Sequence, residues 1–298
     1  MNNPVVNVLV STYNGEEYVD NQIRSILSQT YSNIHIYVRD DGSTDNTMYI
    51  LRSYEVGEKI TLIRGDNKGY GPSFLELLKI SSDGDYWAFC DQDDVWHPDK
   101  IEKAVEGIQK LDLSKPAMYV HNFTLTDEEL VDQGKYANQI KNYSFPMAIT
   151  ECLHMGFATL INDKLRDMML RVDGDKLCSH DWWAELIVME FGNVYTDDYI
   201  GAKHRRLDIS ISSSGMKARV KWFKKALGGN AEIKNLTNEF YREFSDEMNK
   251  HDRKILSWFV SEKYNFLKSV KKAFYIHRWR SSFSSELVVR FLMLIGRI

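Results

Sequence analysis

Three short clusters of acidic and small polar residues stand out as candidates for chemistry. They read DDGSTDNT at 40–47, DQDD at 91–94 and HDWW at 180–183. In DQDD, Asp91 and Asp93 are separated by one residue, so both carboxylates can face one hard divalent cation. Mg2+ is usually bound through one or two carboxylates plus substrate phosphates. This spacing therefore indicates binding of a phosphate-containing substrate through a metal.

Each cluster also has a purely structural interpretation. Asp, Asn, Ser, Thr and Gly are the usual residues of turns and helix caps. DDGSTDNT could therefore be a turn, and Asp93 or Asp94 could cap the helix that follows. Asp181 could cap a helix over a packed aromatic pair, and His204 could be a structural contact. These alternatives stay open at the level of single motifs.

The elements that would position these clusters alternate along the first 125 residues. We expect strands at 5–11, 33–40, 59–64 and 85–91. Each is followed by a helix, at 15–29, 45–54, 72–81 and 98–111 respectively. This order is typical of an α/β fold with a doubly wound, mostly parallel, Rossmann-like sheet, whose ligands lie beyond the carboxyl ends of the strands. STYNGEE at 11–17 also follows a strand, so we expect three clusters on one rim. A cation or polar ligand there would relieve the repulsion between their carboxylates.

The rest of the chain is less periodic at first and then helical. We expect a strand at 117–123, a loop at 127–150 and a helix at 179–192. From 216 onward the pattern is helical, basic and rich in aromatic residues. We therefore predict a domain at 1–215 and a helical C-terminal region at 216–298.

Charge is unevenly distributed between these two parts. Residues 217–298 hold 18 Lys and Arg against 8 Asp and Glu, which leaves 20 against 34 before them. Basic segments that also carry Trp, Phe, Tyr and Leu can lie on an anionic membrane surface; a helical subdomain or a homodimer interface is the alternative. Nucleic acid is disfavoured as a partner, because the acidic part carries the rim and no recognised nucleic-acid motif is present.

The N-terminus and the cysteines indicate the compartment. MNNPVVNVLVSTYNG lacks a basic segment and a long apolar run, so it does not resemble a signal peptide. No segment approaches the roughly 20 apolar residues of a membrane span. Three scattered cysteines without a CxxC pair favour neither a disulfide framework nor a zinc site. We expect a cytoplasmic protein, peripheral at the inner face of the cell membrane.

Taken together and in order, five segments resemble the family 2 glycosyltransferases of the GT-A fold, and among them the bacterial rhamnosyltransferases of surface polysaccharide biosynthesis. The segments are STYNGEEYVDNQIRSILSQTY, RDDGSTDNT, DNKGYGPSF, FCDQDDVWHPDKIE and HDWW, within about the first 185 residues. The resemblance implies a nucleotide-sugar donor, Mg2+ or Mn2+, inversion at the anomeric carbon and a carboxylate general base. It divides the catalytic domain into a nucleotide-sugar half at about 1–115 and an acceptor half at about 116–215.

The resemblance also implies roles for individual residues. Asp181 would be the general base, with His180 beside it. Asp93 and His204 would be metal ligands, although Leu207 and Asp208 stand where the family often has an asparagine shortly after the histidine. Two further sets would bind substrate: Ser11, Thr12, Tyr13, Asp40, Asp41, Lys68, Asp91, Asp94 and Arg205 the nucleotide sugar, and Trp182 and Trp183 the acceptor or a sugar ring.

The function that these features predict is a metal-dependent, inverting, non-processive hexosyltransferase. The QxxRW element and the membrane helices of processive synthases in the superfamily are absent from the sequence. The first donor to test is dTDP-rhamnose, with UDP-hexoses next, and the acceptor would be a saccharide or a lipid-linked saccharide. A catalytically silent nucleotide-sugar-binding scaffold is an alternative that HDWW disfavours. A nucleotidyltransferase is another, disfavoured because STYNGEE is acidic where triphosphate binding needs basic residues.

Overall fold

The computed structural model describes residues 3–136, 144–177, 179–206, 227–228, 231–260 and 264–298. The chain divides into two compact units. The first comprises Met1–Gln139 and His154–Asp208, and the second comprises Ile140–Leu153 and Ile209–Ile298. The predicted boundary at 215/216 lies outside the described residues. Residues 140–153, which the sequence placed in the first domain, group with the C-terminal helices.

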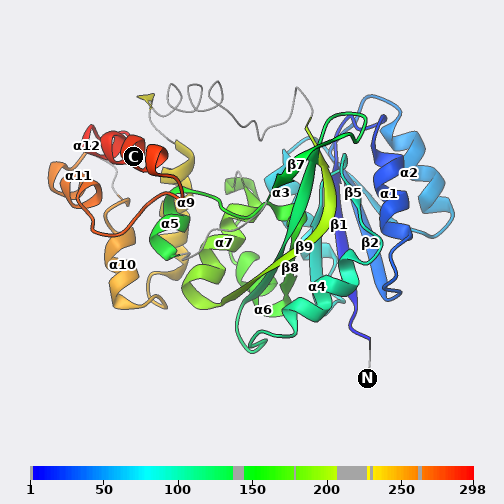
Figure 1. The fold of residues 1–298 in the computed structure, drawn as a ribbon, viewed down its shortest axis with the longest axis horizontal. Helices are drawn as coiled ribbons and strands as arrows, with labels where there is room; N and C mark the ends of the chain where they lie inside the picture. The colour runs from blue at the N-terminus through cyan, green and yellow to red at the C-terminus, as the bar shows by residue number, and fades with distance from the viewer. Residues whose placement is uncertain (1–2, 137–143, 178, 207–226, 229–230, 261–263) are drawn as a thin grey trace. The chain divides into compact units, whose positions relative to one another are not determined.

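The first unit is built on one sheet, nine-stranded in the described chain, in the order β3-β2-β1-β4-β8-β6-β9-β5, with β7 paired to β6 (Figure 1). Its strands are β1 (Val6–Thr12), β2 (Ile34–Asp40), β3 (Thr61–Arg64), β4 (Tyr86–Cys90), β5 (Val95–Trp96), β6 (Ala117–Thr126), β7 (Asp132–Tyr136), β8 (Thr159–Asn162) and β9 (Asn193–Arg205). Its helices are α1 (Val19–Leu27), α2 (Thr47–Val56), α3 (Tyr70–Ile80), α4 (Lys100–Ile108), α6 (Asp163–Met169) and α7 (His180–Phe191), with 3-10 turns η1 (Gly156–Ala158) and η2 (Gly174–Lys176).

The strands of the first 110 residues confirm the predicted parallel arrangement. β1 pairs in parallel with β2 and β4, and β2 pairs in parallel with β3. Their carboxyl ends therefore share one edge of the sheet, as a doubly wound sheet requires. β8 runs antiparallel to β4 and β6, while β9 is parallel to β6.

Both faces of the sheet are covered, which explains why β1 is apolar almost throughout. On one face, Val6, Val8 and Val10 belong to the same core as Ile23 of α1 and Ile101 of α4. On the other face, α3 packs on β1 and on α7. A strand buried on both sides is a continuous apolar run, because every side chain leaves water.

The prediction of a loop at 127–150 is wrong in two places. It contains the strand β7 and the short helix α5 (Phe145–Thr150). β7 reads DQGKY and has no apolar alternation, so the strand pattern is absent from its sequence. α5 has six residues, all buried, which is too short for helical periodicity to emerge. β9 was also not anticipated, because its segment NVYTDDYIGAKHR mixes acidic and apolar residues.

The second unit is helical, as far as it is described. Besides α5 it contains α9 (Ala231–Phe244), α10 (Lys250–Leu256), α11 (Phe266–Ala273) and α12 (Phe283–Leu294). Trp279 is fully buried, and its backbone carbonyl accepts a hydrogen bond from the hydroxyl of Thr150 on α5. Within the described part of the chain, every helix is too short or too polar to cross a bilayer. Trp222 and Phe223, which the sequence counted among the C-terminal aromatics, lie outside the described residues.

Candidate active site

The carboxyl ends of β1 and β4 are joined by a pair of hydrogen bonds. The backbone N–H of Tyr13 donates to the side-chain oxygen of Gln92 at 2.8 Å, and the Gln92 amide donates to the Tyr13 carbonyl at 3.1 Å. The contact is close, since a Cβ on Gly15 would lie 2.4 Å from the Gln92 oxygen. Ser11 is tied to the neighbouring helix α3 through the hydroxyl of Ser73 at 2.9 Å. STYNG and DQDD thus form one continuous rim, as predicted.

Asp40 and Asp41, at the end of β2, are buried, and their oxygens bind protein donors. Asp40 accepts from the Thr12 hydroxyl at 3.2 Å and from the backbone and hydroxyl of Ser43 at 2.9 and 2.6 Å. Asp41 accepts from the backbone N–H of Lys68 at 3.1 Å and of Gly69 at 2.9 Å. The sequence predicted both acids as direct acceptors for base and ribose. In the structure they hold together the loops that border that position.

Arg39 is a buried cation at this end of the sheet that the sequence analysis missed. Its guanidinium pairs with Asp41 and with Glu76 at 3.1 Å, and donates to the Asp66 carbonyl at 3.2 Å. An arginine inside an otherwise apolar strand, directly before two acids, was the available signal. Lys68, a predicted nucleotide contact, is half-exposed, and its amine lies 3.7 Å from Glu76.

The DQDD turn is an acidic cluster of a different kind. Burial, followed by the repulsion of Asp94 and Asp93, raises the pKa of Asp91 to about 8. Burial and the repulsion of Asp94 raise the pKa of Asp93 to about 6. Such shifts arise where carboxylates crowd together out of water, and they concentrate at functional sites.

Asp94 points away from solvent and binds the other predicted metal residue. One of its oxygens lies 2.7 Å from Nδ1 of His204, at the end of β9, and the other is buried and has no hydrogen-bond partner in the described part of the chain. Burial lowers the pKa of His204, but the attraction of Asp94, Asp91 and Asp93 outweighs it and raises the pKa to about 9. The Asp94–His204 contact therefore joins the DQDD turn to the end of β9, and the role of His204 as a metal ligand stays a prediction.

Arg205 is a second cation beside the acids. It is buried, and its guanidinium stands 4.7 Å from the ring centre of Tyr18. Among the residues that the structure describes, Nε and Nη1 have no hydrogen-bond partner. It lowers the pKa of Asp93, which places it within electrostatic reach of the DQDD turn. A buried guanidinium with free donors is suited to bind an anion such as a phosphate.

Asp181 lies in the first turn of α7. Ser179 caps the helix by accepting from the backbone N–H of Trp182 at 3.3 Å, and its hydroxyl also bonds the Asp181 carboxylate. Asp181 raises the pKa of Asp91, so the two carboxylates interact although their positions are 90 apart in the chain. Gly156 packs closely against the start of α7, since a Cβ there would lie only 2.5 Å from Nε2 of His180.

The three residues around Asp181 lie in the core. His180 packs against Phe74 and Phe89 with ring centres 4.1 and 4.6 Å away, and burial lowers its pKa to about 4. Trp182 and Trp183 are buried, and the Trp183 indole donates to the Met169 carbonyl at 3.2 Å. The expected apolar platform for a sugar is therefore not an open surface here. α7 is buried nearly all round, so its aromatic pair packs inward.

Lys100, on α4, is a further charged residue that the sequence analysis overlooked. It is buried, donates to the Phe157 carbonyl at 2.7 Å and stands 3.3 Å from the ring centre of Trp96. Burial lowers its pKa to about 7, against the attraction of Cys90, Asp94 and Asp91. The Phe157 ring stacks on the His204 ring at 4.4 Å. Because Lys100 bonds the backbone of Phe157, it helps to hold the residue that packs on the Asp94–His204 pair. The signal was a lysine on the apolar face of a predicted helix.

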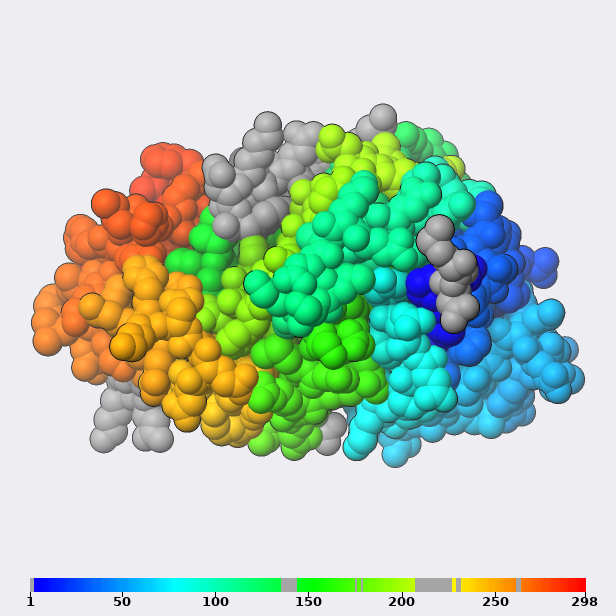
Figure 2. All heavy atoms as spheres, turned by 90° about the horizontal axis from the view of Figure 1, so that it is seen from below, coloured from blue at the N-terminus to red at the C-terminus, as the bar shows by residue number. Residues whose placement is uncertain are grey.

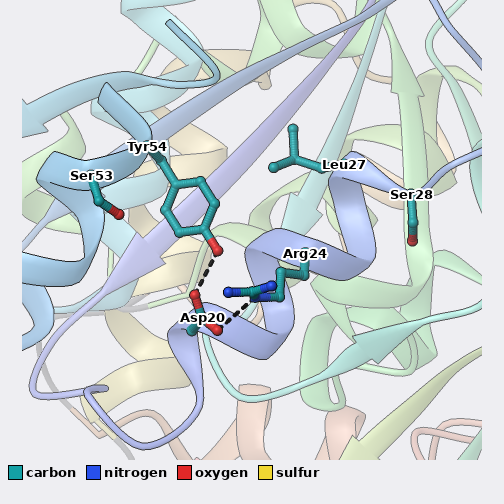
Figure 3. A pocket seen from close by; sticks show the side chains of 6 residues that line it. All are labelled: Asp20, Arg24, Leu27, Ser28, Ser53 and Tyr54. Carbon is teal, nitrogen blue, oxygen red and sulfur yellow. Dashed lines mark hydrogen bonds and ion pairs between the residues drawn. The ribbon is translucent and has the colours of Figure 1, made fainter. Parts of the chain in front are cut away.

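A hollow of about 420 Å³ lies elsewhere, between α1 and α2 (Figure 3). Its lining includes Asp20, which accepts from Arg24 at 2.7 Å and from the Tyr54 hydroxyl at 2.6 Å. None of the predicted site residues lines it. The hollow is a surface feature of two helices and is separate from the strand-end rim.

The DQDD turn fits a hard divalent cation. Asp91 and Asp93 offer oxygen ligands whose raised pKa values reflect burial and then repulsion by neighbouring carboxylates, and one buried Asp94 oxygen has no hydrogen-bond partner among the described residues. Within the described residues, no three His, Cys, Asp or Glu side chains converge into a metal site of their own. This donor set suits a cation that shares its coordination with substrate phosphate.

Comparison with known proteins identifies the relatives of this chain. Residues 7–163 match the family model of Glycosyl transferase family 2. An uncharacterized glycosyltransferase of Rickettsia prowazekii is 36% identical over 208 residues, covering 68% of this chain and 64% of the relative. The dTDP-rhamnosyl transferase RfbG of Shigella flexneri is 31% identical over 185 residues, covering 58% and 63%. The chain therefore spans just under two thirds of the length of these two relatives.

Solved structures confirm the fold. S. aureus TarS 1–349 in complex with UDP-GlcNAc superposes with a TM-score of 0.56 at 14% identity, covering 98% of this chain and 90% of that one. The mannosyltransferase PcManGT from Pyrobaculum calidifontis, in complex with GDP-Man and Mn2+, gives 0.56 at 17% identity, covering 98% and 74%. The predicted GT-A fold is confirmed.

Proposed function

Because this chain belongs to glycosyl transferase family 2, we propose that it is an inverting, metal-dependent, non-processive glycosyltransferase. It moves a sugar from a nucleotide donor to a saccharide or lipid-linked saccharide acceptor, in the biosynthesis of a cell-surface polysaccharide. The observation that carries the proposal is that α7 begins beside the carboxyl end of β4, since the ring of His180 lies 4.6 Å from that of Phe89, two residues before Asp91. Acids from the end of β4 and the start of α7 thereby share one site, one on the donor side and one on the acceptor side.

The chemistry follows from what each residue can do. The acceptor oxygen attacks the anomeric carbon, the bond from that carbon to the diphosphate breaks, and the nucleoside diphosphate leaves. Asp181 accepts the proton of the acceptor hydroxyl as general base. Arg205, with its unpaired donors, stabilises the charge that develops on the diphosphate.

Asp91 and Asp93 are the residues that would hold Mg2+ or Mn2+. When bound, such a cation supplies neutralisation of the diphosphate charge. The 2.7 Å contact between Asp94 and His204 fixes the DQDD turn to β9. We assign Asp93 the more direct contact, and we place the base and ribose between Tyr13 and the loop that Asp41 holds at Lys68–Gly69.

The first donor to test is dTDP-rhamnose. The name of the Shigella flexneri relative supports it, although that relative is matched over 63% of its length. A UDP-hexose is the second candidate, supported by the TarS structures with UDP and UDP-GlcNAc. We further propose that the protein acts at the inner face of the cell membrane, where a lipid-linked acceptor would be found.

The proposal is tested by Asp181→Asn in a donor panel assayed for nucleotide release and for transfer, with and without Mn2+ or Mg2+. We expect transfer to fall by about 10²–10⁴-fold, because general-base catalysis contributes that much, while donor binding is kept. Asp163→Asn is the matched control, since Asp163 is also a first-turn acid, on α6. Unchanged transfer in Asp181→Asn would place the base elsewhere. Donor binding without transfer or hydrolysis for any sugar would favour the silent scaffold.

A further inference from the structure

The helix α12 exposes a stripe of large apolar side chains. Phe283, Leu287 and Phe291 are 72%, 56% and 50% exposed, and they follow one another at intervals of four residues. Residues four apart lie on the same face of a helix. Leu292 and Met293, on the opposite side, are buried. The helix is therefore packed on one side and presents phenylalanine and leucine to solvent on the other.

The helix α11, which packs on α12, and the turn after it also expose large apolar side chains. Phe274 and Ile276 are 75% and 87% exposed, and Phe266 and Leu267 are exposed at the start of the helix. These helices form the orange-to-red surface of Figure 2. Isolated exposed apolar residues are ordinary on proteins, but a gathering of this size marks an interaction site.

The two helices are held firmly together, so the exposed stripe is part of a packed pair. The Arg290 guanidinium on α12 donates to the backbone carbonyls of Ala273 and Tyr275 at 2.7 and 2.8 Å, and to that of His277 at 2.8 Å. The Glu286 carboxylate accepts a hydrogen bond from the backbone N–H of Trp279 at 2.8 Å. The apolar side chains therefore remain outside although the pair itself is fully packed.

Charge distinguishes the kinds of partner that could cover this surface. Residues 264–298 contain seven Lys and Arg against one acid, Glu286. Glu286 is buried and bonded to Arg290, so it contributes no negative charge to the exterior. Lys271 and Arg278 are exposed. Every exposed charged side chain in this segment is thus a cation, standing among apolar groups.

We infer that the α11–α12 face, defined by Lys271, Phe274, Arg278, Phe283, Leu287 and Phe291, docks on a bilayer that contains anionic lipid. Apolar side chains enter the boundary of the acyl chains while cations meet the phosphate headgroups. A second copy of the chain would bring the same cations against each other, which opposes a symmetric dimer through this face. The inference deepens the proposed function, since docking would bring the enzyme to a lipid-linked acceptor.

The test uses the full chain with vesicles of phosphatidylglycerol and phosphatidylcholine, compared with vesicles of phosphatidylcholine alone, in a sedimentation assay. We expect binding to the anionic vesicles that weakens as salt is raised, because cations near the surface act within a Debye length. Leu287→Ser with Phe291→Ser should weaken binding by about tenfold or more for each apolar side chain removed from the bilayer. Lys271→Glu with Arg278→Glu should weaken it by about fivefold or more for each charge.

Two matched controls lie on the first unit. Tyr49→Ser with Val56→Ser removes exposed apolar side chains from α2. Lys59→Glu with Lys79→Glu reverses two exposed cations, one between α2 and β3 and one on α3. Both control variants should bind vesicles as the wild type does. Circular dichroism is used to check that each variant is folded. Absence of binding to anionic vesicles overturns the inference, as does equal loss of binding in the controls. Lipid-free dimerisation abolished by Leu287→Ser with Phe291→Ser also overturns it, in favour of a second copy. Vesicle binding requires no turnover, so its failure leaves the proposed glycosyl transfer untouched.

Discussion

Two acidic pairs at the carboxyl ends of the parallel strands β2 and β4, which flank β1, look alike in the sequence and have opposite environments in the structure. Asp40 and Asp41 are surrounded by donors: backbone N–H groups, hydroxyls and the Arg39 guanidinium. Asp91 and Asp93 face other carboxylates, and their pKa values rise to about 8 and about 6. The first pair is satisfied by the protein itself, and the second needs a proton or a cation from outside. We infer that the first pair builds the rim and the second binds the substrate's metal.

The largest expected effect comes from breaking the second pair. Asp93→Asn removes a ligand of the diphosphate-bound cation, so transfer should fall by about a thousandfold, as loss of a strong electrostatic contact to the reacting groups does. The free energy of unfolding should be unchanged or higher, since one source of repulsion is removed. Transfer rates and thermal denaturation measure the two effects.

Asp83→Asn is the control for this variant, because Asp83 is exposed and precedes the opposite end of β4. It should leave both quantities unchanged. If Asp93→Asn retained full Mn2+-dependent activity, Asp93 would not be a metal ligand.

A substitution in the first pair, Asp40 and Asp41, should mainly lower the free energy of unfolding, whereas a substitution in the second pair should mainly lower the rate of transfer. Asp41→Asn removes one of the two carboxylates that pair with the buried Arg39, the other being Glu76, and replaces acceptors of the Lys68 and Gly69 N–H groups. We expect a loss of about 2–4 kcal/mol in the free energy of unfolding, measured by urea denaturation. Asp66→Asn, an exposed neighbour, should change it by less than about 0.5 kcal/mol. A variant that stays as stable as the wild type while losing donor affinity would instead make Asp41 a direct ligand.

The second pair also predicts how stability depends on pH in the metal-free protein. Asp91 and Asp93 have raised pKa values, about 8 and about 6 against 3.8, so the folded chain holds their protons more tightly than the unfolded chain. Their stabilising contribution is complete below pH 3.8 and is lost as the pH rises toward 8. A divalent cation neutralises the same carboxylates, so Mn2+ should raise the melting temperature more at about pH 8 than at about pH 5. Equal increases at both pH values would contradict this explanation, and Asp93→Asn should reduce the difference.

The smallest expected effect sharpens the role of Asp94. Its attraction and hydrogen bond, together with the other acids, hold the pKa of His204 at about 9 despite burial. Asp94→Asn should therefore lower the pKa of His204 by about one unit or more, measured by NMR titration of the ring. Transfer should fall only by about tenfold. Asp83→Asn should leave the titration unchanged, and an unchanged His204 pKa in Asp94→Asn would mean that Asp91 and Asp93 suffice.

The sequence predicted the parallel half of the fold well because its strands are short apolar runs separated by amphipathic helices. It also predicted that STYNG and DQDD meet, since carboxyl ends of parallel strands share an edge. It did not predict β9, whose polar segment becomes a strand only through pairing with β6. Secondary structure that depends on a tertiary partner leaves little local signal.

The sequence could propose which residues belong to the site, but it could not give their burial or their hydrogen-bond partners. Spacing singled out Asp91 and Asp93 as candidates, and the family resemblance singled out Asp181, but neither could show that Asp40 and Asp41 have internal donors. Nor could either show that Trp183 faces the core, because HDWW reads the same on an open or a buried helix. Lys100 was detectable in principle as a charge on an apolar helix face, yet its contact with Phe157 depends on η1, far along the chain.

The reciprocal hydrogen bonds between Tyr13 and Gln92 couple two tasks that are separate in the chain. The segment that would hold the nucleobase and the turn that would hold the cation are fastened together, so neither can shift without moving its neighbour. Attempts to re-engineer nucleotide preference at Tyr13 should consequently disturb cation affinity too, and evolution of donor choice in this scaffold would have to adjust both at once.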